Sequence, residues 1–419
     1  MSVDTPATIA ILGAGPMGLE TALYARFLGY DVKLYERGTI ADNVLRWGHV
    51  RMFMPFSRNC SRLGLAALAA QDDKYRPPNP SSPLIGREWV RQYLLPLAQT
   101  DLLVDHIREH VTVIGVSRQE LLKEDLPDLP ERGDSPFRIL LREQSGSEFS
   151  EQADIVIDTT GVYGNPNWLG PGGGPAIGET SLRDRIEYGL PDIEGRERDR
   201  YAGRHTLLIG DGYSAATNAV ALYGLALQAP GTQLTWVTAR PPEEIDLGPI
   251  RSVASDPLHS RRELALAANL YARGEGSVIE YWPVTVVEAV THDAEQDQFV
   301  VRCSGQHAGE QRFDRIVASV GYRGDDSIYA ELQVPSCYVT GAPRRLAVAL
   351  RGHTTAGGLP PACPPQTLLN PEPNFYILGA KSYGRDSSFV FATGLDQIRG
   401  LFSIIGDRAD LDLYATVKL

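Results

Sequence analysis

The order of apolar runs, glycine turns and helical spacing predicts a strand–turn–helix–strand unit at the start of the chain. Residues 7–12 form a short apolar run typical of a buried strand, and a glycine-rich turn at 13–18 follows directly. Residues 19–28 then show helical spacing, Gly29 ends this helix, and residues 31–36 again have a strand pattern. The chain therefore opens with a predicted βαβ unit.

The same pattern occurs a second time in the middle of the chain. A strand at 206–209 is followed by a turn at 210–215, a helix at 216–227 and a strand at 233–238. The chain thus carries one architectural unit twice.

The segments around these units are less regular. Residues 37–103 are irregular apart from a helical stretch at 87–97, and residues 104–160 show strands with hairpins that end in a buried strand at 154–158. The Gly/Pro-rich composition of residues 164–198 is typical of a linker or of a loop over a site.

The last third of the chain is rich in loops but contains further predicted elements. They are strands at 284–290, 298–303, 315–320 and 374–378, and a long final helix at 393–405. The terminal strand and helix have no glycine turn of their own. The second unit is therefore expected to be inserted into the first.

Composition and charge narrow the function classes. The 419 residues favour two domains, and the net charge of −12, without a Lys/Arg-rich tract, argues against a nucleic-acid partner. The four cysteines form no C-x-x-C pair and no zinc-type cluster, so we expect reduced thiols and no bound metal. Without an 18-residue apolar run or a signal-peptide pattern, we expect a cytoplasmic protein with no membrane partner.

The first glycine turn has the G-x-G-x-x-G spacing of a dinucleotide-binding loop. Gly13 permits the tight turn, Gly15 lets the backbone approach a pyrophosphate, and Gly18 lets the helix pack closely on the strand. Glu36, 23 positions after Gly13, is expected to accept hydrogen bonds from a ribose. The position of this loop at the start of the chain, with a second such loop downstream, favours FAD. A purely structural glycine turn is the alternative.

The second turn, Gly210 to Ala215, replaces the third glycine of the pattern by alanine. After the next strand the chain has Thr238, Ala239 and Arg240, where an NAD site would have Asp or Glu. A missing carboxylate and an available guanidinium favour the 2′-phosphate of NADPH. The alternative is a loop that keeps the turn and binds nothing.

Together these motifs resemble those of the two-dinucleotide-binding flavoproteins. This group includes thioredoxin-reductase-like enzymes, flavin-containing monooxygenases and N-hydroxylating monooxygenases. Thr159-Thr160-Gly161 and Val320-Gly321-Tyr322, each at the end of a predicted strand, contribute to the resemblance. It implies an α/β fold with two Rossmann-like dinucleotide-binding domains, the second inserted into the first. The FAD-binding domain would comprise 1–163 and 322–419, and the NADPH-binding domain 164–321.

The resemblance also implies a set of cofactor-binding positions. Gly161 and Gly321 would mark the crossings between the domains, Gly379-Ala380 would lie near the flavin ribityl and phosphate, and Ala392 would face the pyrimidine end of the flavin. The expected FAD contacts are Gly13, Gly15, Pro16, Met17, Gly18, Glu36, Arg37, Arg46, Trp47, Val113, Thr160, Gly161, Gly379, Ala380 and Ala392. The expected contacts on the NADPH side are Gly210, Gly212, Tyr213, Ser214, Ala215, Arg240 and Gly321.

Three functions are compatible with this class. The first is an NADPH-dependent monooxygenase, in which oxygen adds to C4a of the reduced flavin and one oxygen atom passes to a small N- or S-containing nucleophile. Asp314 and Tyr322, in a stretch reminiscent of N-hydroxylating enzymes, favour it over the others. The second is a reductase without a redox-active dithiol, and the third is a non-catalytic flavin sensor. A homodimer is compatible with the class, but no patch in the sequence identifies an interface.

Candidate catalytic residues come from two loops. His49 and Arg51 follow the first βαβ unit, where a histidine can move a proton to or from a flavin. Tyr383 and Arg385 lie between the last strand and the last helix, whereas Asp386 or the neighbouring serines could instead cap that helix. A loop at 353–363 is a candidate lid. For each of these residues an ordinary surface or core role is the alternative.

Overall fold

The computed structural model describes residues 3–241, 248–251, 256–274, 278–351 and 363–417. Residues 353–362 of the candidate lid lie outside this described part. The chain forms two compact units, one of residues 1–165 and 323–419 and one of residues 166–322. The second unit is therefore an insertion in the first, which confirms the predicted fold class. The boundaries differ from the expected ones by two residues at the first and one residue at the second.

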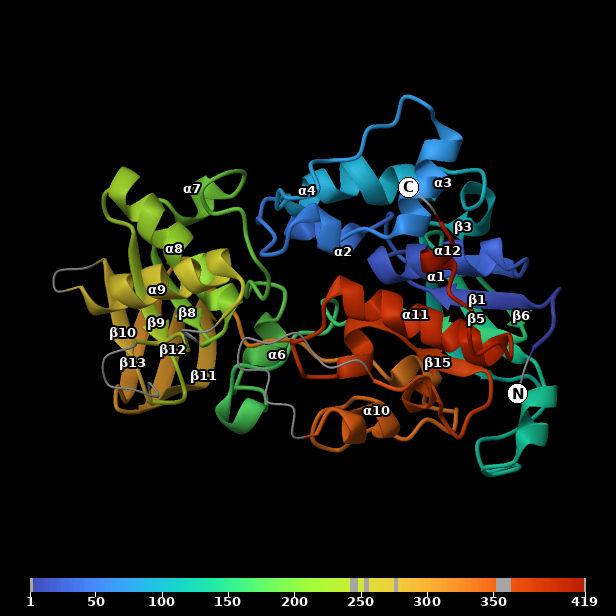
Figure 1. The fold of residues 1–419 in the computed structure, drawn as a ribbon. Helices are drawn as coiled ribbons and strands as arrows, with labels where there is room; N and C mark the ends of the chain where they lie inside the picture. The colour runs from blue at the N-terminus through green and yellow to red at the C-terminus, as the bar shows by residue number, and fades with distance from the viewer. Residues whose placement is uncertain (1–2, 242–247, 252–255, 275–277, 352–362, 418–419) are drawn as a thin grey trace. The chain divides into compact units, whose positions relative to one another are not determined.

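The first unit is built on a five-stranded parallel sheet with the order β15–β7–β1–β2–β3 (Figure 1). Its strands are β1 (Thr8–Leu12), β2 (Asp31–Tyr35), β3 (Ile107–Arg108), β7 (Ile155–Asp158) and β15 (Phe375–Ile377). Leu12 pairs with Tyr35 on one side and with Asp158 on the other, so the carboxyl ends of three strands are level. In open parallel sheets this edge is where ligands bind.

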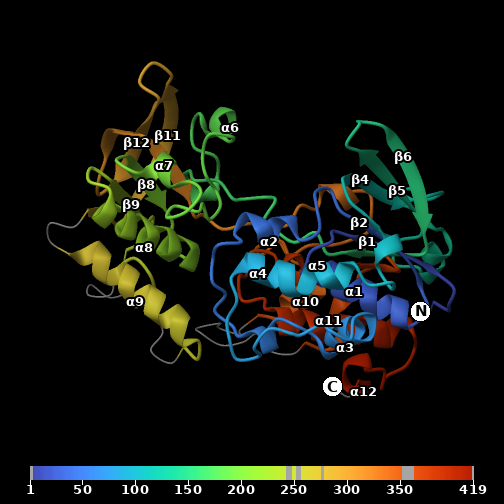
Figure 2. The same cartoon turned by 90° about the horizontal axis from the view of Figure 1, so that it is seen from above.

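Two layers cover this sheet (Figure 2). Ile9 and Ile11 of β1 point into a core shared with helices α1 (Pro16–Phe27), α3 (Arg62–Gln71) and α11 (Phe391–Ile405). Ala10 and Leu12 point to the opposite face, which packs on an antiparallel sheet. That sheet consists of β4 (Val111–Arg118), β5 (Phe137–Glu143) and β6 (Glu148–Ala153). Because both faces are buried, the central strands are continuous apolar runs.

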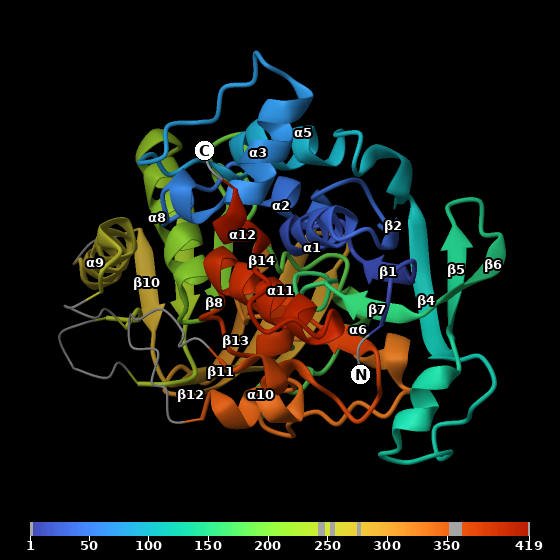
Figure 3. The same cartoon turned by 45° about the vertical axis from the view of Figure 1, so that its right-hand side comes forward.

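Helices α1 and α11 pack against each other although they are more than 360 residues apart along the chain (Figure 1 and Figure 3). The shorter helices of this unit are α2 (Asp42–Arg46), α4 (Gly86–Trp89), α5 (Leu95–Ala98), α10 (Arg344–Ala349) and α12 (Leu413–Thr416). A π-helical turn, Val90–Leu94, joins α4 to α5, so the helical stretch expected at 87–97 is present.

Helix α3 lies in a segment that the sequence pattern left irregular. Ser61 caps it, because its Oγ accepts a hydrogen bond from the Gly64 amide at 2.7 Å. Leu63, Ala67 and Leu68 are buried against the helical core. Only ten residues long and rich in alanine, the helix depends on this packing and shows little amphipathic signal of its own.

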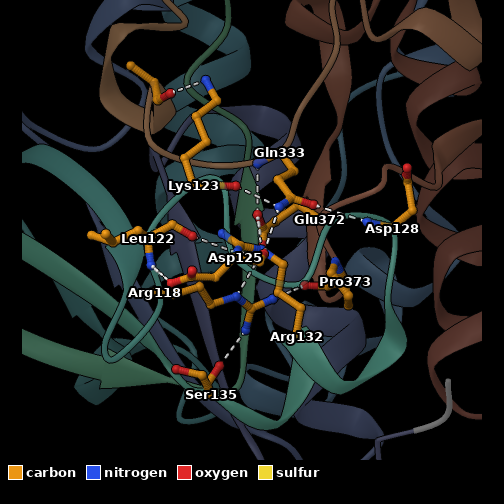
Figure 4. A network of polar contacts seen from close by, with 11 residues as sticks. Arg118, Leu122, Lys123, Asp125, Asp128, Arg132, Ser135, Gln333, Glu372 and Pro373 are labelled. Carbon is orange, nitrogen blue, oxygen red and sulfur yellow. Dashed lines mark hydrogen bonds and ion pairs between the residues drawn. The ribbon is translucent and has the colours of Figure 1, made fainter.

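A buried network of charges joins β4 to the segment before β15 (Figure 4). Glu372 accepts hydrogen bonds from the Nε atoms of Arg118 at 2.7 Å and of Arg132 at 2.9 Å, and all three side chains are fully buried. Arg118 also donates to the Ser135 carbonyl, and Arg132 donates to the carbonyls of Leu122 and Asp125. The network fixes the 119–136 excursion to a segment more than 230 residues later in the chain.

The second unit repeats the layered plan. Its four-stranded parallel sheet has the order β10–β9–β8–β14, and a three-stranded antiparallel sheet has the order β11–β12–β13. Helices α8 (Tyr213–Gln228) and α9 (His259–Arg273) cover one face of the parallel sheet, and the antiparallel sheet covers the other (Figure 2). Short helices α6 (Glu179–Leu182) and α7 (Arg198–Tyr201) precede β8.

The strands of the second unit are β8 (His205–Ile209), β9 (Gln233–Val237), β10 (Ile279–Trp282), β11 (Thr285–Asp293), β12 (Gln298–Gly305), β13 (Gly309–Phe313) and β14 (Arg315–Ala318). Leu208 points to the helices, whereas Leu207 and Ile209 point to the antiparallel sheet. This alternation places the end of β8, and the glycine turn after it, between the two layers.

Candidate functional site

The first glycine loop joins the end of β1 to α1 and has one packed side and one open side. Gly13 has φ +96°, and a Cβ there would lie 3.1 Å from Thr160 Cα. A Cβ at Gly18 would lie 1.9 Å from the Gly13 carbonyl oxygen. A Cβ at Gly15, in contrast, would meet nothing within 4 Å. Gly13 and Gly18 are therefore needed for packing, and Gly15 faces open space.

Helix α1 begins at Pro16, and its N-cap residue, Gly15, has no side chain that could accept a hydrogen bond from the first turn. Such amides and the helix dipole favour a bound anion. The side chain of Met17 is turned away from this opening, since a Cβ on Gly394 would lie 2.3 Å from its Sδ. Met17 thus joins the loop to α11, and only its backbone can contribute to the anion site.

Glu36, after β2, contacts the same loop. Its Oε2 accepts a hydrogen bond from the Ala14 amide at 2.9 Å, and its Oε1 accepts one from Gly38 at 2.8 Å. Each carboxylate oxygen has a second lone pair, so ribose hydroxyls can still be bound. Arg37 is exposed, and its guanidinium lies beside Gly164, where a Cβ would be 2.5 Å from Nη2.

The crossing segment after β7 borders the loop on its other side. Thr159 Oγ1 lies 2.8 Å from the Leu12 carbonyl and 2.9 Å from that of Gly13. Asp158 Oδ1 accepts hydrogen bonds from the amide and the hydroxyl of Thr160. Gly161 has φ +69°, which favours glycine. Thr160 and Gly161 are therefore held at the carboxyl edge of the sheet.

The 3₁₀ turn Gly379–Tyr383 follows β15 at the same edge. The Gly379 amide donates to Gln397 Oε1 at 2.9 Å, and Gln397 Nε2 donates to Ser382 Oγ at 2.8 Å. Gly379 has φ +77°, and a Cβ there would lie 3.0 Å from Met17 Cγ. Gln397 was not among the expected site residues, because its partner is 18 positions away and no local pattern marks it.

Helix α11 begins at Phe391, so Ala392 lies in its first turn as expected. The alternative that Asp386 or a serine caps this helix is wrong. Its N-cap residue is Val390, which has no capping oxygen, and Asp386 Oδ1 accepts a hydrogen bond from the Ser388 amide instead. The first turn of α11 therefore has no side-chain cap, like that of α1.

The candidate residues between positions 46 and 51 have environments that differ from one another. Arg46, at the end of α2, forms an exposed ion pair with Asp42 at 2.9 Å. Trp47 packs on Gly86, where a Cβ would lie 2.7 Å from the indole Cζ3. His49 is half-buried, whereas Arg51 is exposed and donates to the Pro83 carbonyl at 2.9 Å. Arg46 and Arg51 are thus engaged in local contacts.

Tyr383 is buried and lines a small pocket of about 20 Å³ together with Cys363, Thr393 and Gln397. Burial raises the pKa of the Tyr383 phenol, so this group stays protonated and can donate a hydrogen bond into the pocket. Arg385 is exposed, and its amide donates to the Thr340 carbonyl at 2.8 Å. Val113 lies at the β-bulge of β4, where the pairing with β5 shifts between Val113 and Gly115.

The second glycine loop follows β8 and has the same packed and open sides. Gly210 has φ +130°, and a Cβ there would lie 2.2 Å from the Ser319 carbonyl oxygen. A Cβ at Gly212 would meet nothing within 4 Å. Gly212 is the N-cap of α8, which begins at Tyr213 and has no side-chain cap. Ala215 is fully buried and occupies the packed position of the third glycine.

The end of β9 lies beside this loop. Thr238 Oγ1 lies 2.8 Å from the Tyr281 hydroxyl and 3.1 Å from the Arg240 carbonyl, and the Arg240 side chain is exposed. The guanidinium of Arg261, on α9, also lies near this loop, 5.4 Å from the ring centre of Tyr213, and it is paired with the Asp256 carboxylate at 2.6 Å. The adjacent residues Arg261 and Arg262, near the start of α9, are the sequence signal that could have indicated a cation in this region.

Two other expected residues have structural contacts. Asp314 Oδ2 accepts a hydrogen bond from the His205 amide at 2.8 Å, at the start of β14. The Tyr322 hydroxyl donates to the Tyr188 carbonyl at 2.7 Å. Gly321 has φ +78° and follows β14, as Gly161 follows β7. The side chains of Asp314 and Tyr322 therefore bind backbone groups of the second unit, on either side of β14.

Within the described ranges, no group of three or more His, Cys, Asp or Glu side chains is arranged to hold a metal ion. In that same part of the chain, no helix is long and apolar enough to span a bilayer.

No protein-family model matches the sequence, and no curated protein matches it. Solved structures do match over nearly the whole chain. Bacillithiol disulfide reductase Bdr (YpdA) from Bacillus cereus aligns with a TM-score of 0.68 at 16% identity, covering 96% of this chain and 100% of that one. Thioredoxin reductase from T. acidophilum aligns with a TM-score of 0.55 at 16% identity, covering 96% and 99%.

The FAD-bound cadaverine monooxygenase DfoA from Erwinia amylovora aligns with a TM-score of 0.58 at 16% identity, covering 97% of this chain and 95% of that one. The chain therefore has the fold of the two-dinucleotide-binding flavoproteins, as the sequence motifs predicted. The fold is shared by reductases and by a monooxygenase, so it does not separate these activities.

Proposed function

We propose that the chain is an oxidoreductase that binds FAD in the first unit and NADPH in the second. The observation that carries this proposal is the repeated geometry of the two loops. Gly15 and Gly212 each cap a helix without a side chain and face open space, while Gly18 and Gly210 are packed against backbone oxygens. Two uncapped helix starts at the carboxyl edges of two parallel sheets suit two dinucleotide pyrophosphates.

The surrounding residues fit these cofactors. Glu36 retains acceptor capacity for a ribose of FAD, and the uncapped start of α11 would favour negative charge on a reduced flavin. In the second unit Thr238 stands where a carboxylate would repel a 2′-phosphate, and the exposed Arg240 supplies a cation. FAD, when bound, supplies the chemistry of accepting a hydride equivalent and passing electrons on.

The thiols disfavour a dithiol relay. Burial raises the pKa of Cys60 to about 12 and that of Cys303 to about 11, whereas hydrogen bonds from the backbone at Thr340 and Val339 lower the pKa of Cys337 to about 7. Cys337 has no second cysteine in a C-x-x-C spacing with which to form a redox-active pair. The four cysteines form no disulfide in the structure. We therefore propose that molecular oxygen is the electron acceptor and that a small N- or S-containing nucleophile is oxygenated. Tyr383 would donate a hydrogen bond to this substrate, and His49 would move a proton.

A reductase that uses flavin alone is the second candidate. Bdr and the T. acidophilum thioredoxin reductase, two of the three similar structures given above, are reductases by name, and they are the precedent for this candidate. Such an enzyme would pass electrons from the flavin directly to a small acceptor, and it needs none of the four cysteines.

Stopped-flow spectroscopy of the purified, FAD-loaded protein tests both candidates. NADPH should bleach the visible flavin band under anaerobic conditions. When oxygen is then admitted, a transient species before the oxidised spectrum returns supports monooxygenation, and direct reoxidation supports the reductase. A bound flavin that NADPH does not bleach would point to a non-catalytic sensor, and a protein that binds no FAD would contradict the proposal.

A further inference from the structure

A buried ammonium group contacts both segments in which the chain passes between the two units, here called the crossings. The outgoing crossing follows β7 and ends at Asn165, and the returning crossing begins at Arg323. The outgoing crossing packs on the first glycine loop, here called the FAD loop. Lys381, in the turn after β15, is 3% exposed. Its Nζ lies 2.5 Å from Asp158 Oδ2, 3.2 Å from Thr160 Oγ1 and 2.5 Å from the Asp325 carbonyl. An ammonium has three donors, and here each one has an acceptor. Its position 4.8 Å from the ring centre of Tyr329 adds a cation–π contact.

The three acceptors belong to two segments of the first unit, the end of β7 with the residues after it and the segment in which the chain returns from the second unit. Asp158 ends β7 and holds the amide and hydroxyl of Thr160, whose backbone packs on Gly13. Asp325 follows the point at which the chain returns from the second unit. Lys381 itself lies two residues after Gly379. One side chain therefore contacts the outgoing crossing, the returning crossing and the turn at the carboxyl edge of the sheet.

The crossings are also bonded to each other next to this ammonium. The Arg323 amide donates to the Asn165 carbonyl at 3.0 Å, and Asn165 Nδ2 donates to the Gly324 carbonyl at 3.3 Å. A Cβ at Gly324 would lie 2.9 Å from Lys381 Cγ, so the lysine stem packs directly on the returning crossing. Removing the ammonium would leave the fully buried Asp158 carboxylate without a countercharge.

We propose that Lys381 is a positioning residue for the flavin reaction. It fixes residues 158–160 and Asp325 beside the glycine loop at 13–18 and so holds the flavin-binding edge of the first sheet in the geometry that the reaction requires. A buried pair of this kind contributes more to a defined geometry than to net stability. This inference rests on the proposed function for its catalytic consequence, but its structural consequence holds for the chain without cofactor.

The test compares Lys381→Met, the double variant Asp158→Asn/Lys381→Met, and Lys33→Met as a control. Lys33 forms a partly exposed ion pair with Glu151 in the same unit. In the cofactor-free protein, hydrogen exchange at the Thr160 and Arg323 amides should become about tenfold faster in Lys381→Met, because local opening costs less there. It should not change in Lys33→Met. Equal exchange in the two single variants overturns the proposal.

The FAD-loaded proteins separate positioning from plain stability. The double variant removes the uncompensated charge, so its unfolding midpoint should return close to that of the wild type. Its reduction by NADPH should remain about tenfold slower, and the circular dichroism of the bound flavin should stay altered. Recovery of rate and flavin signal along with stability would show a merely structural role and overturn the proposal. A wild type that binds no FAD contradicts the proposed function, while the exchange experiment still tests whether Lys381 holds the Thr160 and Arg323 segments in place.

Discussion

Glu36 Oε2 accepts a hydrogen bond from the Ala14 amide at 2.9 Å, which ties the end of β2 to the loop after β1. The carboxylate therefore organises the glycine loop through the protein backbone, before any ribose is considered. This contact explains why an acidic residue after the second strand belongs to the local structure as well as to nucleotide recognition. The geometry of the loop is set by the chain itself.

The packed and open glycines of the first loop should respond differently to alanine. Gly18→Ala places a methyl 1.9 Å from a carbonyl oxygen that cannot move freely, so we expect a loss of about 1–3 kcal/mol in unfolding free energy. Gly15→Ala meets no atom and should change stability by less than about 1 kcal/mol. It should nevertheless weaken FAD binding at least about tenfold, because its methyl occupies the approach to the uncapped helix.

Urea unfolding and FAD titration of both variants check this pair. Tight FAD binding by Gly15→Ala would mean that the open side of the loop is not the pyrophosphate site.

Arg240 should discriminate between the two nicotinamide cofactors. Arg240→Ala should weaken NADPH at least about tenfold and NADH by no more than about twofold, since only NADPH offers a phosphate for a charge-assisted hydrogen bond. Arg302→Ala, an exposed arginine on β12, is the matched control and should affect neither. Binding constants from fluorescence titration decide the matter. Equal losses for both cofactors in Arg240→Ala would defeat the assignment of Arg240 to the 2′-phosphate.

The buried charge network predicts a large stability effect at Glu372. Glu372→Gln leaves Arg118 and Arg132 without a countercharge, so we expect a loss of about 3–5 kcal/mol in unfolding free energy. Glu148→Gln breaks the exposed Arg142–Glu148 pair of the same unit and should cost less than about 1 kcal/mol. Denaturant unfolding measures both. A loss in Glu372→Gln as small as that in Glu148→Gln would show that the backbone carbonyls bound by Arg118 and Arg132 compensate the two charges without Glu372.

Glu20 predicts a pH dependence of stability. This residue of α1 is fully buried, and burial raises its pKa to about 7, although hydrogen bonds with Tyr93 and Ser61 oppose the shift. A raised pKa means that the folded state favours the protonated carboxyl. Its stabilising effect is complete below pH 4.5 and is lost as the pH rises towards 7. Glu20→Gln should therefore remove a penalty of about 3 kcal/mol above pH 7.

Thermal unfolding of the wild type and Glu20→Gln between pH 5 and pH 9 tests this sign. The variant should gain stability over the wild type as the pH rises, and a constant difference across the range would contradict the assignment.

Local patterns were sufficient to predict both βαβ units, the packed Gly18 and open Gly15 of the first loop, and the insertion of one domain in the other. These features depend on residues within about 25 positions of each other, where strand and helix periodicity is visible. The pairing of Lys381 with Asp158 spans 223 positions, and that of Arg118 with Glu372 spans 254. Neither leaves a local trace, since each residue alone looks like an ordinary surface charge. Helix α3 was missed because tertiary packing, more than its own periodicity, stabilises it.

The place of β15 in the first sheet has a consequence for biosynthesis. Strand β7 pairs with β1 on one side and with β15 on the other, and β15 is made about 220 residues later. While the ribosome is still producing the inserted unit, β7 therefore has an unpaired edge. The apolar surface that α11 later covers is also exposed at this stage. Such edges recruit other strands. The inserted unit is contiguous and can fold first, so nascent chains stalled before residue 375 should be the most dependent on chaperones.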